Sequence, residues 1–347
     1  MPRNILFITV GGLNHASSRT RVFNYRSQLV ANNLRIHYLK NRVLLKSRFL
    51  TDCINFFRKR SFGIRIWMKI LTVPKHRLLV FCQKEILPMK VVSYLKSKRA
   101  KIVYDIDDSI FINFDQKGLS KFNKFLKSTD EVIASTKYLA EQIRERSVTC
   151  IPTPVFVLDE GPVIRKLSES VITFGWIGSP STESNLELVL PVFKKLSKIY
   201  NFEVILVGAK KYKVYARNSW CFVKEWSLNS ESDTLNEIDY GLAPLEKTRW
   251  NEGKGGYKIN LYMSKGIPVL ASPIGINADL VKTGTNGFHC SDKTDWERHI
   301  VKVLKKEVDY SSLSLNASEN VKKGYSYKVC FEKLSCVMKH IYAKEKK

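Results

Sequence analysis

Two lysines in a glycine-rich stretch are the residues of this sequence best suited to chemistry. Residues 250–275 read WNEGKGGYKINLYMSKGIPVLASPIG, with Lys254 among three glycines and Lys258 four residues later. Glycines let a backbone approach a ligand closely, and a helix that begins near Lys258 would offer unpaired N–H groups. The stretch therefore predicts a site for a diphosphate. The alternative is an ordinary loop before a helix, because loops of glycine and lysine are common.

Three carboxylates form a second candidate cluster. Asp105, Asp107 and Asp108 follow the predicted strand Lys101–Tyr104, in a half of the chain where acids are scarce. Asp105 and Asp107 could hold a divalent metal ion. Alternatively, Asp107 and Asp108 could position the hydroxyl group of a second substrate. A structural role, in which a buried Asp105 bonds backbone amides, is also open.

Strand-like and helix-like segments alternate along the chain and must position both clusters. The predicted strands are 4–10, 35–39, 77–81, 101–104, 131–134, 171–176, 203–207, 221–223, 241–244 and 268–271. The predicted helices are 19–32, 51–71, 88–98, 119–128, 137–146, 182–200, 231–236, 257–265 and 327–343. Such alternation implies parallel sheets covered by helices on both faces. Prolines and glycines in 151–168 indicate a linker, so we expect two doubly wound α/β domains.

Ligands of open α/β sheets bind at the carboxyl ends of the strands, which adds further candidates. Gly11 and Gly12 follow the first predicted strand, and Gly178 and Ser179 follow the first strand of the second half. Arg19 and Arg21, in the run SSRTR, could each bind a phosphate with two hydrogen bonds. In the alternative interpretation, Ser17 or Ser18 caps a helix and the arginines lie on the surface.

Composition narrows the class of protein. A chain of 347 residues fits two domains, and no apolar run approaches the roughly 20 residues that span a bilayer. The N-terminus lacks the features of a signal peptide. Seven scattered cysteines without a C-x-x-C pair indicate reduced thiols and argue against a zinc site or a disulfide framework. These features favour a cytoplasmic protein.

Charge is distributed unevenly. The net charge is +26, and residues 1–101 contain 22 lysines and arginines against the two acids Asp52 and Glu85. Such asymmetry points to an anionic partner. Residues 49–71 mix aromatic and basic side chains, as helices at a lipid headgroup interface do. A core-facing helix with a solvated basic face is the alternative. No nucleic-acid-binding motif is visible, so we expect no nucleic acid partner.

The segment 250–275 also resembles a known family. It has every fixed position of the pattern W-x-x-G-K-x-x-[FY]-K-x-x-x-Y-M-x-x-G-x-P-V-x-x-S-P-x-G. This pattern is similar to the donor-binding segment of GT-B glycosyltransferases of the "glycosyl transferases group 1" type, closest to members of polysaccharide and lipid-linked saccharide biosynthesis. FGWIGSP (174–180) and DYGLAPL (239–245) extend the resemblance. Leu261 departs from it, because many relatives carry Glu or Gln there to hold the nucleotide ribose.

The resemblance implies a fold and a division of the chain. GT-B proteins have two Rossmann-like doubly wound parallel-sheet domains that face each other across a cleft. We expect an acceptor-binding domain at 1–160 and a nucleotide-sugar-binding domain at 161–326. By analogy with the family, the C-terminal helix 327–347 packs back on the first domain.

The resemblance also implies roles for individual residues. The expected catalytic residues are Lys254, Lys258, Asp107 and Asp108. The expected donor-binding residues are Gly11, Gly12, Gly178, Ser179, Glu252, Gly255, Gly256, Tyr257 and Asn260. Arg19, Arg21 and Asp107 are expected to bind the acceptor. GT-B donor sites are free of metal, so the resemblance favours the acceptor role for the carboxylates, with no metal ion and no cofactor.

The implied activity is sugar transfer with retention of configuration. The donor would be a UDP- or GDP-linked sugar, and the acceptor a lipid-linked saccharide at the inner face of the cell membrane, for cell-surface polysaccharide. The basic first domain would contact the anionic membrane surface. Two alternatives remain: a catalytically weak GT-B protein that binds membrane or nucleic acid, and a sugar-nucleotide epimerase. Nucleotide release with and without acceptor separates them.

Overall fold

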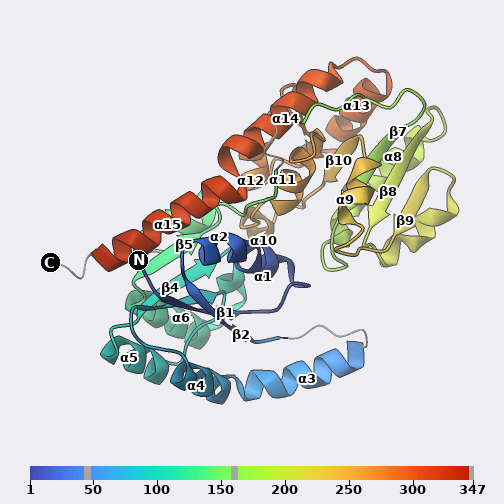
Figure 1. The fold of residues 1–347 in the computed structure, drawn as a ribbon. Helices are drawn as coiled ribbons and strands as arrows, with labels where there is room; N and C mark the ends of the chain where they lie inside the picture. Colours follow the sequence, from blue (N-terminus) through green and yellow to red (C-terminus); the bar gives the residue numbers. More distant parts are fainter. Residues whose placement is uncertain (43–47, 158–162, 344–347) are drawn as a thin grey trace. The chain divides into compact units, whose positions relative to one another are not determined.

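The chain forms two compact units in a computed structural model that describes residues 1–42, 48–157 and 163–343 (Figure 1). The first unit comprises Met1–Pro154 and Tyr327–Lys347, and the second comprises Val155–Ser326. The domain boundary expected at 160/161 lies outside the described residues. The two compact units meet between Pro154 and Val155 in the sequence.

The first unit is built around a six-stranded parallel sheet of order β2-β1-β3-β4-β5-β6. Its strands are β1 (Asn4–Thr9), β2 (Arg35–Lys40), β3 (Leu78–Gln83), β4 (Lys101–Ile106), β5 (Glu131–Ala134) and β6 (Val148–Cys150). Its helices are α1 (Ala16–Arg21), η1 (Phe23–Tyr25), α2 (Arg26–Ala31), α3 (Arg48–Arg60), α4 (Phe62–Thr72), α5 (Met89–Ser97), η2 (Ile110–Asn113), α6 (Gln116–Ser128), α7 (Lys137–Glu141) and α15 (Tyr327–Ala343).

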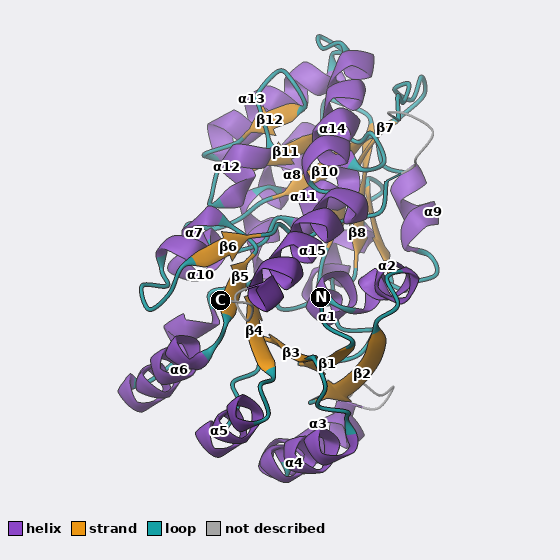
Figure 2. Cartoon of the chain, turned by 60° about the vertical axis from the view of Figure 1, so that its left-hand side comes forward, coloured by secondary structure: helices purple, strands orange, loops and turns teal. Residues whose placement is uncertain are grey.

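Alternate residues of the strands face opposite sides of this sheet, and helices cover both. Leu6, Val80 and Tyr104 pack with α4, α5 and α6, which lie in a row along one face (Figure 2). Phe7, Phe81 and Val103 pack with α2 and α15 on the other face. Strands covered on both faces are apolar throughout, which explains why β1 and β3 have no exposed residue.

The second unit contains a six-stranded parallel sheet of order β12-β11-β10-β7-β8-β9. Its strands are β7 (Ile172–Ile177), β8 (Phe202–Val207), β9 (Cys221–Lys224), β10 (Tyr240–Ala243), β11 (Val269–Ala271) and β12 (Gly287–His289). Its helices are η3 (Glu183–Leu188), α8 (Leu190–Leu196), η4 (Lys211–Arg217), α9 (Glu231–Asn236), α10 (Arg249–Glu252), α11 (Tyr257–Met263), α12 (Ile276–Leu280), α13 (Lys293–Leu304) and α14 (Tyr310–Gly324).

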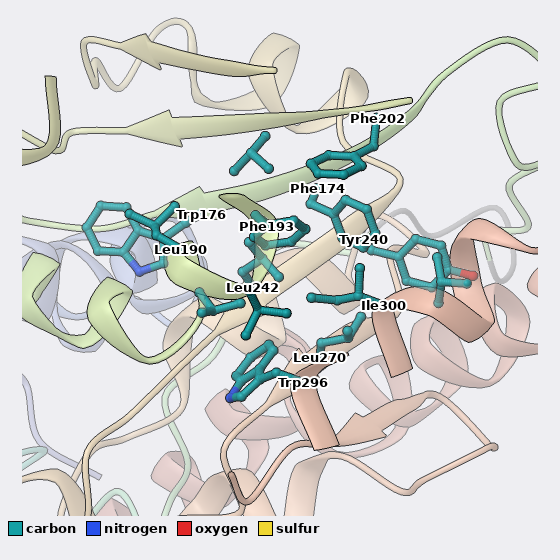
Figure 3. Packing of buried hydrophobic residues seen from close by; sticks show 14 of the residues in the cluster. Phe174, Trp176, Leu190, Phe193, Phe202, Tyr240, Leu242, Leu270, Trp296 and Ile300 are labelled. Atoms are coloured by element: carbon teal, nitrogen blue, oxygen red, sulfur yellow. The ribbon is translucent and has the colours of Figure 1, made fainter. Parts of the chain in front are cut away.

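Aromatic side chains fill one face of the second sheet. Phe174 and Phe193 lie with ring centroids 5.0 Å apart, and Phe202, Tyr240 and Trp176 belong to the same cluster (Figure 3). The other face packs against α9, α11 and α14. Two doubly wound parallel sheets were predicted from the alternation of elements, and this prediction is confirmed.

Several boundaries differ from those predicted. The single helix expected at 51–71 is two helices, α3 and α4, separated by Ser61, whose hydroxyl donates to the carbonyl of Phe57 at 3.0 Å. The helix expected at 19–32 is divided into α1, η1 and α2. Strands β6 and β12, and helices α12, α13 and α14, were not predicted. Three-residue strands such as β6 and β12 give no readable alternation.

Candidate functional site

Lys258 lies above the ring of Trp176 in the second unit. Its Nζ is 4.3 Å from the ring centroid, a distance typical of a cation–π contact. Trp176 belongs to β7 and Lys258 to α11. Tyr262 of α11 bonds the helix to this strand, because its hydroxyl donates to the carbonyl of Gly175 at 2.9 Å and accepts from the N–H of Ile177 at 2.8 Å. The position of Lys258 is therefore fixed by the docking of α11 on this strand.

No described carboxylate neutralises Lys258. Burial lowers its pKa to about 7, and the positive charge of Lys254 acts in the same direction. Lys254 lies over the ring of Trp250, with Nζ 5.1 Å from the centroid. Two ammonium groups that destabilise each other gain from an anion placed near both, so this part of the second unit is suited to bind a phosphate.

The glycines around these lysines are needed for close packing. Gly256 precedes α11 with φ +68°, a left-handed conformation that favours glycine. Gly275 lies against the neighbouring segment, where an added Cβ would be 2.3 Å from the carbonyl oxygen of Glu252. The short helix α10 directly precedes Gly253, and the Thr248 side chain caps it by accepting from the N–H of Asn251.

Gly178 and Ser179 follow β7, as predicted. A Cβ on Gly178 would lie 2.3 Å from Cζ2 of Trp176, so Gly178 and Lys258 both contact this indole ring. Ser179 is exposed, and its hydroxyl lies 2.8 Å from that of Ser181. Thr182 occupies the cap position of η3, but its side chain makes no capping hydrogen bond.

The other expected donor residues surround the same loop. Tyr257 is the first residue of α11 and is partly buried, and Asn260 is fully buried on that helix. Glu252 ends α10, and Gly255 lies between the two helices. Leu261 packs at the edge of an apolar cluster. Its hydrocarbon side chain cannot accept a hydrogen bond from a ribose hydroxyl.

Strand order marks a second location, in the first unit. The chain reverses direction across the sheet between β1 and β3, the kind of switch point where open α/β sheets bind ligands. Gly11 and Gly12 follow β1 there. The N–H of Gly11 donates to Oγ of Ser18 at 3.1 Å, and this hydroxyl donates to Oε1 of Gln83 at 2.9 Å. The end of β1 is thereby tied to the end of β3.

Lys84 is the residue at this location that the sequence analysis missed. It follows β3, and its Nζ lies 2.8 Å from carboxylate oxygens of both Asp107 and Asp108 and 2.9 Å from the Ser17 hydroxyl. Burial alone would raise the pKa of Asp107, but Lys84 outweighs burial and, with help from Arg21, lowers it to about 2. Asp107 and Asp108 are held together by Lys84, and the low pKa of Asp107 keeps its carboxylate ionised at neutral pH.

The two arginines of the SSRTR run are buried and not on the surface. Arg21 forms an ion pair with Asp105, in which Nε donates to Oδ2 at 3.1 Å, and its NH1 donates to the carbonyls of Ile151 and Pro152. These bonds make Arg21 an internal tie, which leaves it little capacity to bind an acceptor. Arg19 donates to the carbonyl of Leu13 at 3.0 Å.

The expected cap of the first helix also needs correction. The side chain of His15, and not that of Ser17 or Ser18, accepts the capping hydrogen bond, which comes from the N–H of Ser18. Since Nδ1 accepts this bond, the neutral ring carries its proton on Nε2. Burial and the nearby Lys84 lower the pKa of His15, which keeps the ring neutral at physiological pH.

The carboxylates have cationic partners in the structure. Asp105 pairs with Arg21, whereas Asp107 and Asp108 pair with Lys84. Among residues 1–42, 48–157 and 163–343, no group of three histidine, cysteine or acidic side chains could hold a metal ion. The structure places Gly178 and Lys258 at the same indole ring, that of Trp176, and joins Asp107 and Asp108 through Lys84.

Comparison with known proteins identifies the class. Residues 171–306 match the family model described as "Glycosyl transferases group 1". This range covers most of the second unit, including Trp176, Lys254 and Lys258. A search of curated protein sequences finds no match.

Solved structures share the fold over nearly the whole chain. HepE of Anabaena in complex with UDP is 14% identical with a TM-score of 0.67, and the match covers 97% of this chain and 100% of that chain. Sucrose-phosphate synthase from Thermosynechococcus elongatus is 12% identical with a TM-score of 0.72, over 99% and 100% of the two chains. A glycosyltransferase from Rickettsia africae is 12% identical with a TM-score of 0.66, over 99% of each chain.

Fold and family match lead to the same class. The protein has the GT-B fold, as predicted, and its second unit carries a group 1 glycosyltransferase domain. The protein is a glycosyltransferase.

Proposed function

We propose that this glycosyltransferase moves a sugar from a nucleotide-diphosphate sugar to a saccharide acceptor, and that Lys258 stabilises the departing diphosphate. The observation that carries the proposal is a partly buried ammonium group held over Trp176 without a described carboxylate partner. A bound diphosphate would supply the missing negative charge. That charge grows as the glycosidic bond breaks, so the benefit is largest in the transition state.

Lys254 is the second cation of the donor site. It lies close enough to lower the pKa of Lys258, and a pyrophosphate has enough charge to interact with both. Gly255 and Gly256 let the backbone approach the phosphates, while Gly178 and Ser179 approach from the end of β7. Glu252, Tyr257 and Asn260 complete the proposed donor set. A donor-binding role for Gly11 and Gly12, which lie in the first unit, stays a prediction from the family resemblance.

UDP is the first nucleotide to test. HepE was solved with UDP and with UDP and glucose, and Staphylococcus aureus TarM was solved with UDP and alpha-GlcNAc-glycerol. GDP is the alternative nucleotide. Because Leu261 offers no acceptor, the ribose hydroxyls must be bound by another residue in this chain. The donor is a substrate, and we assign no cofactor and no metal ion to the reaction.

Acceptor binding is assigned to the first unit. Asp107 and Asp108 provide carboxyl oxygens that can accept a hydrogen bond from an acceptor hydroxyl, and both contact Lys84. Arg19 is the proposed cation of the acceptor site. We propose that the acceptor is a lipid-linked saccharide for cell-surface polysaccharide and that transfer retains the anomeric configuration. The acceptor assignment rests on the family resemblance and on the basic charge of residues 1–101, whereas retention rests on the resemblance alone.

A lipid-linked acceptor implies work at a membrane. None of the helices in the described residues has the length and apolar character needed to cross a bilayer. We therefore propose peripheral association with the inner face of the cell membrane through the basic first unit, with no nucleic acid partner.

A transfer assay with a panel of nucleotide sugars tests the proposal. Native protein is compared with Lys258→Ala, and Lys265→Ala, on the same segment but bonded to Ser232, is the control. A lower transfer rate in Lys258→Ala alone supports the donor site. Equal transfer rates in native protein, Lys258→Ala and Lys265→Ala reject it. EDTA should leave the rate unchanged. The anomeric configuration of the product, read by NMR, tests retention, and thermal shifts with UDP, GDP, ADP and CMP identify the nucleotide.

A further inference from the structure

An apolar stripe runs along the outward face of α4 and continues onto α3. Ile64, Met68 and Leu71 are 66%, 56% and 64% exposed and recur at the spacing of one helix face. Phe57 of α3 is 69% exposed and packs edge-on against the ring of Phe56. A contiguous patch of large exposed apolar side chains is rare on a soluble protein and marks an interaction surface, so we expect this face to bind a partner. We call Phe57, Ile64, Met68 and Leu71 the outer stripe.

The inner side of the same segment explains why the outer stripe cannot turn inward. Ile66 and Ile70 are fully buried in the core of the first unit. Arg58 and Arg65 both donate to the carbonyl of Lys40 at 2.6 Å, which fixes α3 and α4 to the end of β2. The helices are anchored by one face and present apolar side chains on the other.

Cations lie on the same two helices as the outer stripe and on the neighbouring edge strand. Lys59 is exposed on α3 and Lys69 is partly exposed on α4, while Arg35, Lys40 and Arg42 are exposed on and just after β2. Strand β2 is the edge strand of the sheet beside these helices. Asp52 is the sole acid of residues 48–72. An apolar stripe with a basic border matches the layered chemistry of an anionic lipid surface, hydrocarbon beneath phosphate.

We propose that the outer stripe is the membrane-docking face of this protein, with Phe57, Ile64, Met68 and Leu71 inserted among acyl chains and Lys59 and Lys69 in contact with anionic headgroups. This inference rests on the proposed function in one respect: docking on a membrane would bring a lipid-linked acceptor to the enzyme. It adds the individual side chains that make the contact with the anionic membrane surface.

Two other occupants fit the face less well. A second copy of the chain would bring the same cations against each other, and like charges oppose association. A nucleic acid would satisfy the cations but leave the apolar side chains in water, since its exposed surface is phosphate. Both occupants are outcomes of the test below.

The test measures binding of the full chain to vesicles by sedimentation. Vesicles of phosphatidylcholine alone are compared with vesicles of equal parts phosphatidylcholine and phosphatidylglycerol. We expect binding to the second kind alone, and a decrease as salt is raised. The double variant Ile64→Ser/Leu71→Ser should lower the partition coefficient about tenfold or more. Lys59→Gln and Lys69→Gln should each lower it about fivefold.

Matched controls come from the second unit. Ile199→Ser removes a side chain that is 71% exposed, and Lys198→Gln removes an exposed lysine. Both should bind as the native protein does, and all variants should keep the native melting temperature because every change is at an exposed or partly exposed site. Equal binding to neutral vesicles, or native binding by the Ile64/Leu71 variant, would overturn the proposal.

Further measurements separate the inference from the proposed function. UDP affinity, measured without membranes, should be unchanged in the Ile64/Leu71 variant. If the native protein binds UDP but not anionic vesicles, the docking face is wrong and the donor site stands. A dimer that the Ile64/Leu71 changes dissociate, or DNA binding that they abolish, would assign the face to those partners instead.

Discussion

Lys258 and Trp176 form a cation–π pair, with 4.3 Å between the ammonium nitrogen and the ring centroid. The pair joins the start of α11 to the carboxyl end of β7. The ring holds the ammonium in place but supplies little negative charge, so an incoming phosphate does not have to displace a carboxylate.

Removal of the Lys258 charge should reduce catalysis more than donor binding. We expect Lys258→Met to lower kcat by on the order of 10²–10³-fold, because the lysine interacts most strongly with the charge that develops in the transition state. Methionine keeps contact with the Trp176 ring, so the melting temperature should not fall. Steady-state kinetics with native protein and Lys265→Met check this. A change confined to KM would contradict the assignment.

Nucleotide binding should depend on pH through Lys258. Its pKa is about 7 in the folded protein, and a bound diphosphate would raise it. Formation of the UDP complex above pH 7 should therefore take up a proton, and the affinity should fall by up to about tenfold per pH unit as pH rises from about 7 to 9. Calorimetry in buffers of different ionisation enthalpy measures the proton uptake. The Lys258→Met variant corrects for protons bound by the phosphate itself.

Lys258 should also make protein stability depend on pH, but in the opposite direction to UDP affinity. Because its folded pKa lies below the ordinary value of 10.5, the unfolded chain binds more protons between these values. The contribution of Lys258 to the free energy of unfolding should rise with pH from about 7 to 10.5. Chemical denaturation across this range should show that Lys258→Met has the larger free energy of unfolding at pH 7, and that its difference from native protein shrinks as pH rises to 10.5. A difference that stays constant with pH would mean that the pKa of Lys258 is not lowered.

Gly178→Ala should damage the donor site through Trp176. The new methyl group would lie 2.3 Å from Cζ2 of the indole, so the ring must move, at a cost of about 1–3 kcal/mol. Movement of the ring displaces Lys258, and UDP affinity should fall as well as stability. Gly63→Ala, at a helical position with nothing within 4 Å of the new methyl, is the control and should not destabilise. Native affinity in Gly178→Ala would show that the ring does not position the lysine.

Lys84→Met should destabilise the first unit strongly. The variant leaves the buried carboxylate of Asp107 and the partly buried carboxylate of Asp108 without the Lys84 charge, at a cost of about 3–5 kcal/mol at neutral pH. The low pKa of Asp107 stabilises the native protein above pH 3.8, and this contribution is lost as pH falls through about 2. The difference in unfolding free energy between native protein and variant should therefore shrink over that range. Lys84→Arg keeps the charge, so its free energy of unfolding should fall much less than that of Lys84→Met. An equal fall in the two variants would contradict the ion-pair account.

Buried strands were the part of the fold that the sequence revealed best. Runs such as 78–83 and 172–177 are apolar because helices cover both faces of the sheet, and an apolar run between breakers can be read without a structure. Helices α13 and α14 could also have been found. Asp292 and Asp309 cap their first turns, which is a readable signal.

Long-range pairing was the part that could not be read. Arg21 was interpreted as a possible surface residue, yet it bonds Asp105, 84 positions away, in the core. Lys84 follows a strand as an isolated lysine, and its role exists because β3 and β4 are neighbours in the sheet. Lys258 was found because local glycines mark it. Its lowered pKa was not foreseen, since that depends on how α11 docks against β7.

The Trp176 indole has a consequence for inhibitors. A cation resting on an aromatic face, unlike one bonded to a carboxylate, is available to any compact anion of the right size. Diphosphate mimics that lack a nucleoside, such as bisphosphonates, should therefore compete with the donor, and a flat group beside the anion could gain further by stacking where the ammonium now rests.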